Sequence, residues 1–331
     1  MLKTFIKHYL ELPSTKKRIV CLGGGVGTAQ ILKGLRKYDL DLTAVVSMAD
    51  DGGSAGRLRR AFSVLPSGDI VNCLAALSDE ESILNKLFLY RFGGKRYGKD
   101  TDLGGQKLGN LIFVALADIY QGNMSQALEH FSRLISSRGK VLPATLGDVN
   151  IWVKTKKGIE VYGEEKIDTG KYKGQRALEH VYLDPPDIEA YKPTLEAIKE
   201  ADKIIVGPGD LFTTVLPVLM VPKILKLLKK IKCKKNFIVN IANKPFETSN
   251  FKVSDFLRVL KNHLGKDLFD SIVVNMNYKP SIPTNFHYQY VKYDRQNLAE
   301  YKNSIIEGDF VNEEFALYHD SDKIAQQLVK I

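Results

Sequence analysis

In this chain, apolar segments with the character of buried strands run repeatedly into glycine-rich, polar turns. In open α/β sheets, such turns follow the carboxyl ends of parallel strands and hold ligands. The pattern therefore predicts the α/β class, with a doubly wound, mostly parallel, Rossmann-like sheet. The strand and turn pairs are 18–22 with 23–28, 42–46 with 49–54, and 203–206 with 207–213.

The alternation of strands and helices is interrupted in the middle of the chain. Residues 149–154 and 159–162 alternate in polarity around Lys156-Lys157-Gly158, which predicts a hairpin. We expect residues 1–17 to be an N-terminal appendage and residues 18–331 to be a single α/β domain with a β-rich insertion at about 140–183. Elsewhere the apolar spacing predicts helices at 111–120, 124–136, 194–200, 253–264 and 321–329, and strands at 237–241, 271–275 and 288–293.

The net charge of +10 raises the question of anionic partners, including nucleic acid. Seven lysines lie between residues 223 and 235, on a segment whose apolar positions have helical spacing. No aromatic or arginine pattern accompanies them, so they predict a solvated face and no nucleic-acid partner. No apolar run approaches the ~18 residues of a membrane span, and we expect a soluble, cytoplasmic protein. The three cysteines are far apart, which argues against a zinc motif and a disulfide framework.

The first glycine-rich turn departs from the dinucleotide-binding fingerprint. The G-x-G-x-x-G pattern fails, because its last position is Thr28 when counted from Gly23. No acidic residue closes the second strand, and no G-K-[ST] sequence follows. We expect the turn to cradle phosphate or ribose through backbone amides, and the alternative is a tight strand-to-helix turn. The residues of this cradle are Gly24, Gly25, Gly27 and Thr28.

The second turn offers two adjacent carboxylates, Asp50 and Asp51. Adjacent side chains at a strand end diverge, so we expect only one to face a ligand. That one could accept sugar or ribose hydroxyls, hold a cation or act as a base, and the alternative is a helix N-cap. Arg57 would neutralise phosphate charge, and the alternative is a surface arginine. Small residues that would present amides nearby are Gly52, Gly53 and Ser54.

Further candidates lie at the starts of later helices. Asp69 and Asn72 are three residues apart on one face of a helix start, where Asp69 could instead be a cap. Asn110 could likewise cap the helix that follows it. No Ser–His–Asp set, nucleophilic cysteine or two-histidine motif is visible, and we predict no metal motif. The remaining candidates for ligand binding are Gly68, Gly109, Gly207, Pro208, Gly209 and Thr213.

Six motifs occur in order at 23–27, 49–59, 65–72, 108–111, 141–145 and 207–213. Taken together, they are similar to those of the YvcK-type proteins, often labelled gluconeogenesis factors, which belong with the archaeal CofD enzyme, a 2-phospho-L-lactate transferase. The likeness runs from about residue 18 to about residue 275.

The resemblance implies a Rossmann-like fold with a cleft for a nucleotide-linked ligand. For the YvcK branch the implied ligand is UDP-N-acetylglucosamine. The implied role is regulatory, linking carbon metabolism to amino-sugar and cell-wall precursor supply and to cell shape, with a metabolic enzyme of amino-sugar synthesis as partner. The CofD branch instead transfers a phospholactyl group from a guanosine diphosphate carrier to a deazaflavin, and Mg²⁺ and a catalytic Asp50 belong to that alternative. Self-association into a homo-oligomer is compatible with either interpretation.

The chain departs from the family pattern at several positions. Asp210 stands where the YvcK branch has serine, and an aspartate near a diphosphate is unfavourable unless it caps a helix or binds a cation. Loss of a tyrosine hydroxyl at Phe251 removes one candidate hydrogen bond to a ligand. These departures bear on the identity of the sugar more than on the fold. The other departures are Val26, Gln106 and Phe246.

Overall fold

A computed structural model describes residues 16–96, 98–99, 102–172, 177–301 and 304–331, so nearly all of the expected N-terminal appendage lies outside the described residues. At its centre is a seven-stranded sheet in the order β12-β10-β8-β7-β1-β2-β3, with every neighbouring pair parallel. The predicted fold class is confirmed. The strands are β1 (Lys17–Gly23), β2 (Leu40–Val46), β3 (Lys140–Pro143), β7 (Lys203–Val206), β8 (Lys234–Ile238), β10 (Ser271–Asn275) and β12 (Ile305–Gly308).

The strand order places a topological switch point between β1 and β7. From β1 the chain builds outward through β2 to β3, and it then returns to the other side of β1 to build β7, β8, β10 and β12. Gly23 pairs with Val46, and Leu22 pairs with Val206, so β1, β2 and β7 end at the same level. Ligands of open α/β sheets bind in the crevice at such a point.

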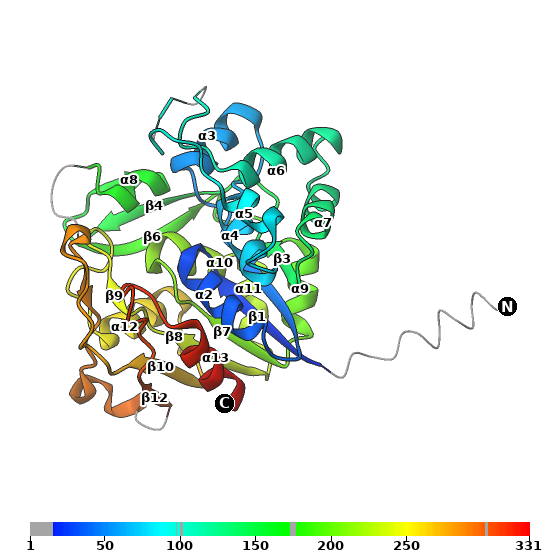
Figure 1. The fold of residues 1–331 in the computed structure, drawn as a ribbon. Coiled ribbons are helices and arrows are strands. Elements are labelled where there is room, and N and C mark those ends of the chain that lie inside the picture. The colour runs from blue at the N-terminus through cyan, green and yellow to red at the C-terminus, as the bar shows by residue number, and fades with distance from the viewer. Residues whose placement is uncertain (1–15, 97, 100–101, 173–176, 302–303) are drawn as a thin grey trace.

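Helices cover the sheet and bury its apolar side chains. Helix α2 packs against α4 and α13, and Figure 1 shows α2 beside α13 in front of the strands. Gly34 permits this approach, because a Cβ there would lie 1.9 Å from the Ser321 carbonyl oxygen. The helices are α2 (Gly25–Leu35), α3 (Gly53–Phe62), α4 (Gly68–Leu77), α5 (Ile83–Leu89), α6 (Leu108–Ile119), α7 (Met124–Leu134), α9 (Lys192–Lys199), α10 (Leu216–Leu219), α11 (Pro222–Leu228), α12 (Val253–Leu264) and α13 (Ser321–Lys330).

The insertion is a small antiparallel sheet with one helix. Its strands are β4 (Asn150–Thr155), β5 (Glu160–Tyr162) and β6 (Leu178–Asp184), in the order β5-β4-β6, and α8 (Glu164–Thr169) follows β5. The predicted hairpin is confirmed by the antiparallel pairing of β4 with β5. The insertion was expected to start near residue 140, and this boundary is wrong, because β3 pairs with β2 in the main sheet and the insertion begins after β3.

Two expected elements differ from the structure in the C-terminal third. The strand expected at 288–293 is reduced to β11 (Gln289–Tyr290), which pairs antiparallel with β9 (Ala242–Asn243) outside the main sheet. The edge strand β12 was not predicted, because its apolar run is only two residues long and its strand character depends on pairing with β10. Long-range pairing decides both cases.

Within the described part of the chain, no single helix has the length and apolar composition to cross a membrane. In this described part, the pair Leu211–Leu219 and Pro222–Leu228, whose helices are bent by 75° relative to each other, meets that criterion when the two are taken together.

Candidate functional site

A cavity of about 440 Å³ lies at the carboxyl edge of the sheet, over the switch point. Five of the six sequence motifs contribute to its wall, and they come from the turns after β1, β2 and β7 and from the starts of α4 and α6. The structure therefore brings most of the predicted site residues together. Those that line the cavity are Gly24, Gly25, Gly27, Asp50, Gly52, Ser54, Gly68, Asp69, Asn72, Asn110, Pro208, Gly209 and Thr213.

The turns after β1 and β7 are held against each other at the switch point. The Thr28 hydroxyl accepts a hydrogen bond from the Gly24 amide at 2.9 Å and donates to the Pro208 carbonyl at 3.2 Å. Gly27 allows this contact, since a Cβ there would lie 2.7 Å from the same carbonyl oxygen. Thr28 is fully buried and does not line the cavity, so its expected place in the ligand cradle is corrected to a link between the two turns.

The amino end of α2 opens into the cavity beside Asp69. The Gly25 amide donates to the Asp69 carboxyl, and a Cβ on Gly24 would lie 2.1 Å from Asp69 Oδ2. Burial raises the pKa of Asp69 to about 7, the nearby Asp50 adds to the rise, and the Gly25 hydrogen bond opposes it. The expected alternative, that Asp69 caps α4, is wrong, because the N-cap position is Ser67.

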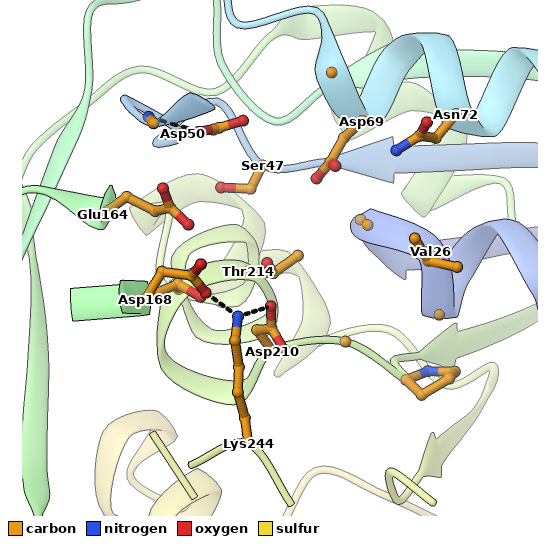
Figure 2. A pocket seen from close by; sticks show the side chains of 18 of the residues that line it. Val26, Ser47, Asp50, Asp69, Asn72, Glu164, Asp168, Asp210, Thr214 and Lys244 are labelled. Atoms are coloured by element: carbon orange, nitrogen blue, oxygen red, sulfur yellow. Dashed lines mark hydrogen bonds and ion pairs between the residues drawn. The ribbon is translucent and has the colours of Figure 1, made fainter. Parts of the chain in front are cut away.

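The adjacent carboxylates Asp50 and Asp51 point in different directions, as expected. Asp50 faces the cavity opposite Glu164 of the insertion (Figure 2), and its Oδ1 accepts from the Gly52 amide at 2.9 Å. Asp51 Oδ1 accepts from the Glu165 amide at 2.7 Å, which satisfies the first turn of α8. Asp51 is therefore the residue on which the insertion helix docks, and Asp50 is the one available to a ligand.

Asp50 and Glu164 form a carboxyl pair across the cavity wall. Burial raises the pKa of both groups, and their mutual repulsion raises the pKa of Glu164 further. The Gly52 hydrogen bond and the charge of Arg96 partly offset the rise at Asp50. The pair therefore holds a proton more readily than two solvated carboxylates would.

Arg57 is neither a phosphate contact nor a surface residue in this structure. Its side chain is only 1% exposed, and it donates to the carbonyls of Lys99 at 2.8 Å, Asp102 at 3.1 Å and Gly104 at 2.8 Å. Both expectations for Arg57 are corrected, because the guanidinium hydrogen-bonds the described part of the loop at 91–105 and does not line the cavity. Gly53, Gly109 and Gly207 also lie outside the cavity lining.

Hydrogen bonds connect the second turn to the start of α6. The Ser54 hydroxyl accepts from Arg91 Nη1 at 3.1 Å and from Asn110 Nδ2 at 3.3 Å, which leaves its own proton to be donated. Helix α6 begins at Leu108, so Asn110 lies inside its first turn, and its expected capping role is wrong. Its Oδ1 is buried and has no partner among the described residues. These groups could hydrogen-bond a ligand.

Lys107 belongs to the cavity although the sequence offered no signal for it. Its ammonium donates to Asn72 Oδ1 at 2.6 Å, which orients the Asn72 amide. Burial and the neighbouring charge of Arg91 lower the pKa of Lys107 to about 8, while Asp69 opposes the change. At neutral pH this group still supplies a positive charge beside Asp69.

Lys244 explains how Asp210 is tolerated in the glycine-rich turn after β7. Its ammonium contacts Asp168 of the insertion and lies 2.5 Å from Asp210 Oδ2 (Figure 2). It also lies 3.6 Å from Glu247 Oε1. Ligand atoms of these three carboxylates lie within 4.8 Å of one another, which suits a metal ion. Lys244 supplies the positive charge of this cluster, so Asp210 is a paired group.

The other departures from the family pattern divide between cavity and core. Val26 lines the cavity. Phe246 lies against Gly170 at the end of α8, and Phe251 packs its ring against Phe212 and Phe256. Gln106 is buried behind the lining.

Several cavity residues lie in segments without a glycine motif. They come from the insertion, the loop before α6, the segment after β8 and the C-terminal segment. The sequence offers little signal for them, because contact with the cavity depends on how distant segments pack. The charged and aromatic members are Arg91, Arg96, Lys107, Glu164, Asp168, Lys244, Tyr288, Tyr318 and His319.

Comparison with known proteins supports a single assignment. Residues 19–311 match the family described as 2-phospho-L-lactate transferase CofD. The chain is 38% identical to the gluconeogenesis factor of Bacillus subtilis over 332 residues, which covers 96% of this chain and 98% of that protein. It is 36% identical to the gluconeogenesis factor of Listeria monocytogenes over 320 residues, or 95% of each.

A solved structure has the same fold. The crystal structure of a upf0052 family member from Bacillus halodurans matches with a TM-score of 0.85 at 33% identity, over 95% of this chain and 99% of that one. The sequence likeness, the doubly wound sheet and the glycine turns at its switch point agree. The chain therefore belongs to the CofD family, among the YvcK-type proteins named gluconeogenesis factors.

Proposed function

We propose that the cavity binds a nucleotide-sugar of the UDP-N-acetylglucosamine type and that the protein acts as a regulator. In this role it links carbon metabolism to amino-sugar and cell-wall precursor supply and to cell shape, by docking to a metabolic enzyme of amino-sugar synthesis. The name gluconeogenesis factor, carried by its relatives, is consistent with a role in carbon metabolism.

One observation carries the proposal: the glycine-rich turns after β1 and β7 meet at the amino end of α2. Helix amino ends carry N–H groups that have no partner within the helix and a partial positive charge, and glycines let a diphosphate approach the backbone. Among the described residues, none beyond its chain neighbours and its own helix places a heavy atom within 4 Å of the Gly25 Cβ position, so the cradle has room for such a group. Lys107 and Arg91 add positive charge to the same wall.

The proposal is tested by calorimetry and thermal shift with UDP-N-acetylglucosamine, with and without Mg²⁺. At a ligand concentration of 100 Kd, binding stabilises the fold by about 2.7 kcal/mol. A methyl group in the cradle, introduced by Gly25→Ala, should weaken binding. Gly122→Ala is the matched control, because both glycines have positive φ (65° and 80°) with open space at the Cβ, and Gly122 lies outside the cavity lining. An absence of heat at millimolar ligand, or an equal effect of the two variants, contradicts the assignment.

A second function is favoured by the carboxyl groups in the cavity and by the family's enzymatic member. In a CofD-like transfer, an acceptor hydroxyl forms a new P–O bond to the phospholactyl phosphorus, and the bond to the nucleoside monophosphate breaks. In this reaction Asp50, which lines the cavity, would take the hydroxyl proton. Mg²⁺-dependent release of the nucleoside monophosphate, abolished by Asp50→Asn, would establish this reaction. Binding without release favours the regulator.

A further inference from the structure

We infer that a nucleotide-sugar binds along the carboxyl edge of the sheet in a single orientation. Its sugar lies between Asp50 and Glu164, and its base lies at the C-terminal segment that contains Leu317, Tyr318 and His319. This inference rests on the proposed function and adds the orientation of the ligand. It also assigns a sugar-binding role to Glu164, which belongs to the insertion and to none of the sequence motifs.

The strand order supplies the first argument. Along the edge, the ends of neighbouring strands follow in the order β2, β1, β7, β8. They present in turn Asp50, the turn at 23–28, the turn at 207–214 and the segment from Asn240 to Ala242. Three steps of about 4.8 Å separate β2 from β8, so the edge spans roughly 14 Å. That length suits an extended molecule whose diphosphate lies over the two central turns.

The end of the cavity near β2 has the chemistry of a sugar site. Asp50 and Glu164 are half-buried, face each other and come from different parts of the fold (Figure 2). A carboxyl pair that shares a proton offers both an acceptor and a donor, as does a sugar hydroxyl. The Ser54 hydroxyl lies on the same turn as Asp50. It accepts hydrogen bonds from Arg91 and Asn110, so its own proton can be donated to a ligand. This end offers hydrogen bonds and little apolar surface for a base.

The end near β8 has the chemistry of a base site. Ile241 and Leu317 are buried apolar residues of the lining, and the rings of Tyr288 and Tyr318 complete this wall. Ile241 is fixed by a separate apolar cluster with Val311 and Ala316. Flat apolar and aromatic surfaces stack on nucleobases, whereas carboxylates do not.

His319 adds a polar group to the base end. It is 2% exposed, and burial lowers its pKa to about 3, so its ring is neutral. Its hydrogen bond to the Val239 carbonyl takes the one ring proton, and its Nε2 has no partner among the described residues. A base with an N–H group would meet an acceptor at this end of the cavity.

The experiment compares UDP with UDP-N-acetylglucosamine by calorimetry on the full chain. Glu164→Gln and Asp50→Asn keep the size of the side chain and remove its charge. We expect each variant to lower the affinity for UDP-N-acetylglucosamine about tenfold, which is the effect of losing one charge-assisted hydrogen bond. The affinity for UDP should change by less than about twofold. Glu165→Gln is the matched control, because the Glu165 carboxylate follows Glu164 in the chain but pairs with Lys171 and does not line the cavity.

Tyr288→Ala, at the base end, should lower the affinity for both ligands by the same factor. If Glu164→Gln and Asp50→Asn weaken UDP and UDP-N-acetylglucosamine equally, or change neither, the orientation is wrong while the proposed function stands. If the unmodified chain binds neither ligand, the proposed function fails and the orientation fails with it.

Discussion

The charge state of Asp69 gives the sharpest test of the cavity electrostatics. Asp69→Asn keeps the shape of the side chain and an oxygen that accepts from the Gly25 amide, but removes the ionisable group. In the folded chain burial raises the pKa to about 7, against 3.8 for the ordinary carboxyl. The unfolded chain therefore ionises Asp69 at a lower pH than the folded chain does, and deprotonation favours unfolding.

The magnitude follows from the difference of about 3 pKa units, which is worth about 4 kcal/mol at 1.36 kcal/mol per unit. The sign is fixed by the direction of the shift. Below about pH 4 both states are protonated and the penalty is absent; it grows as the pH rises towards 7 and is complete above that. The opposing loss of a negative charge in the first turn of α4 is worth only about 0.3–1 kcal/mol. We therefore expect Asp69→Asn to stabilise the fold at pH 8.

The assay is urea unfolding of both proteins at pH 5 and pH 8, with thermal melts as a second measurement. An unfolding entropy of about 0.7 kcal/mol per kelvin for a chain of this length converts 4 kcal/mol into a Tm increase of roughly 6 °C at pH 8. Asp187→Asn, at an exposed aspartate, serves as the control. A stability difference that is equal at both pH values, or a destabilised variant at pH 8, refutes the reasoning. The same variant should bind UDP-N-acetylglucosamine more tightly at pH 8, because a negative charge beside the α2 amino end is gone.

Three further perturbations test how the cavity is assembled. Gly27→Ala places a Cβ 2.7 Å from the Pro208 carbonyl oxygen and should cost about 1–3 kcal/mol in urea unfolding while lowering nucleotide affinity. Arg57→Met removes three hydrogen bonds to the loop before α6 and should destabilise the fold by about 2–4 kcal/mol. Lys244→Met leaves three close carboxylates without their cation, so Mn²⁺ should raise the Tm of this variant by more than it raises that of the unmodified chain.

Each of these expectations has a clear contrary result. Unchanged unfolding free energy for Gly27→Ala would mean that the two turns separate without cost. Arg57→Met with native stability and weakened nucleotide binding would restore Arg57 as a direct phosphate contact. An equal Mn²⁺ response in the two proteins would show that Lys244 is not the cation of its cluster.

The sequence by itself determined the fold class and the glycine-rich part of the cavity wall. Strands followed by glycine turns predict a doubly wound sheet, and parallel strands must all end at the same edge. The turns that begin at Gly23, Asp50 and Gly207 therefore had to converge once the sheet formed. The divergence of Asp50 and Asp51 was also predictable, because neighbouring side chains at a strand end point to opposite sides.

Only the tertiary structure decided where the polar side chains of these motifs point. Arg57 turns into the protein because three loop carbonyls lie within its reach, and Thr28 is used to join two turns. Neither partner set is local in sequence, so no motif could specify it.

The same reason explains the residues that the sequence missed. Glu164 and Lys244 reach the cavity because the insertion docks on Asp51 and because the segment after β8 folds back over Asp210. Local sequence fixes strands and turns, whose geometry depends on the backbone. The charge balance of the cavity depends on contacts between segments far apart in the chain, which exist only after packing.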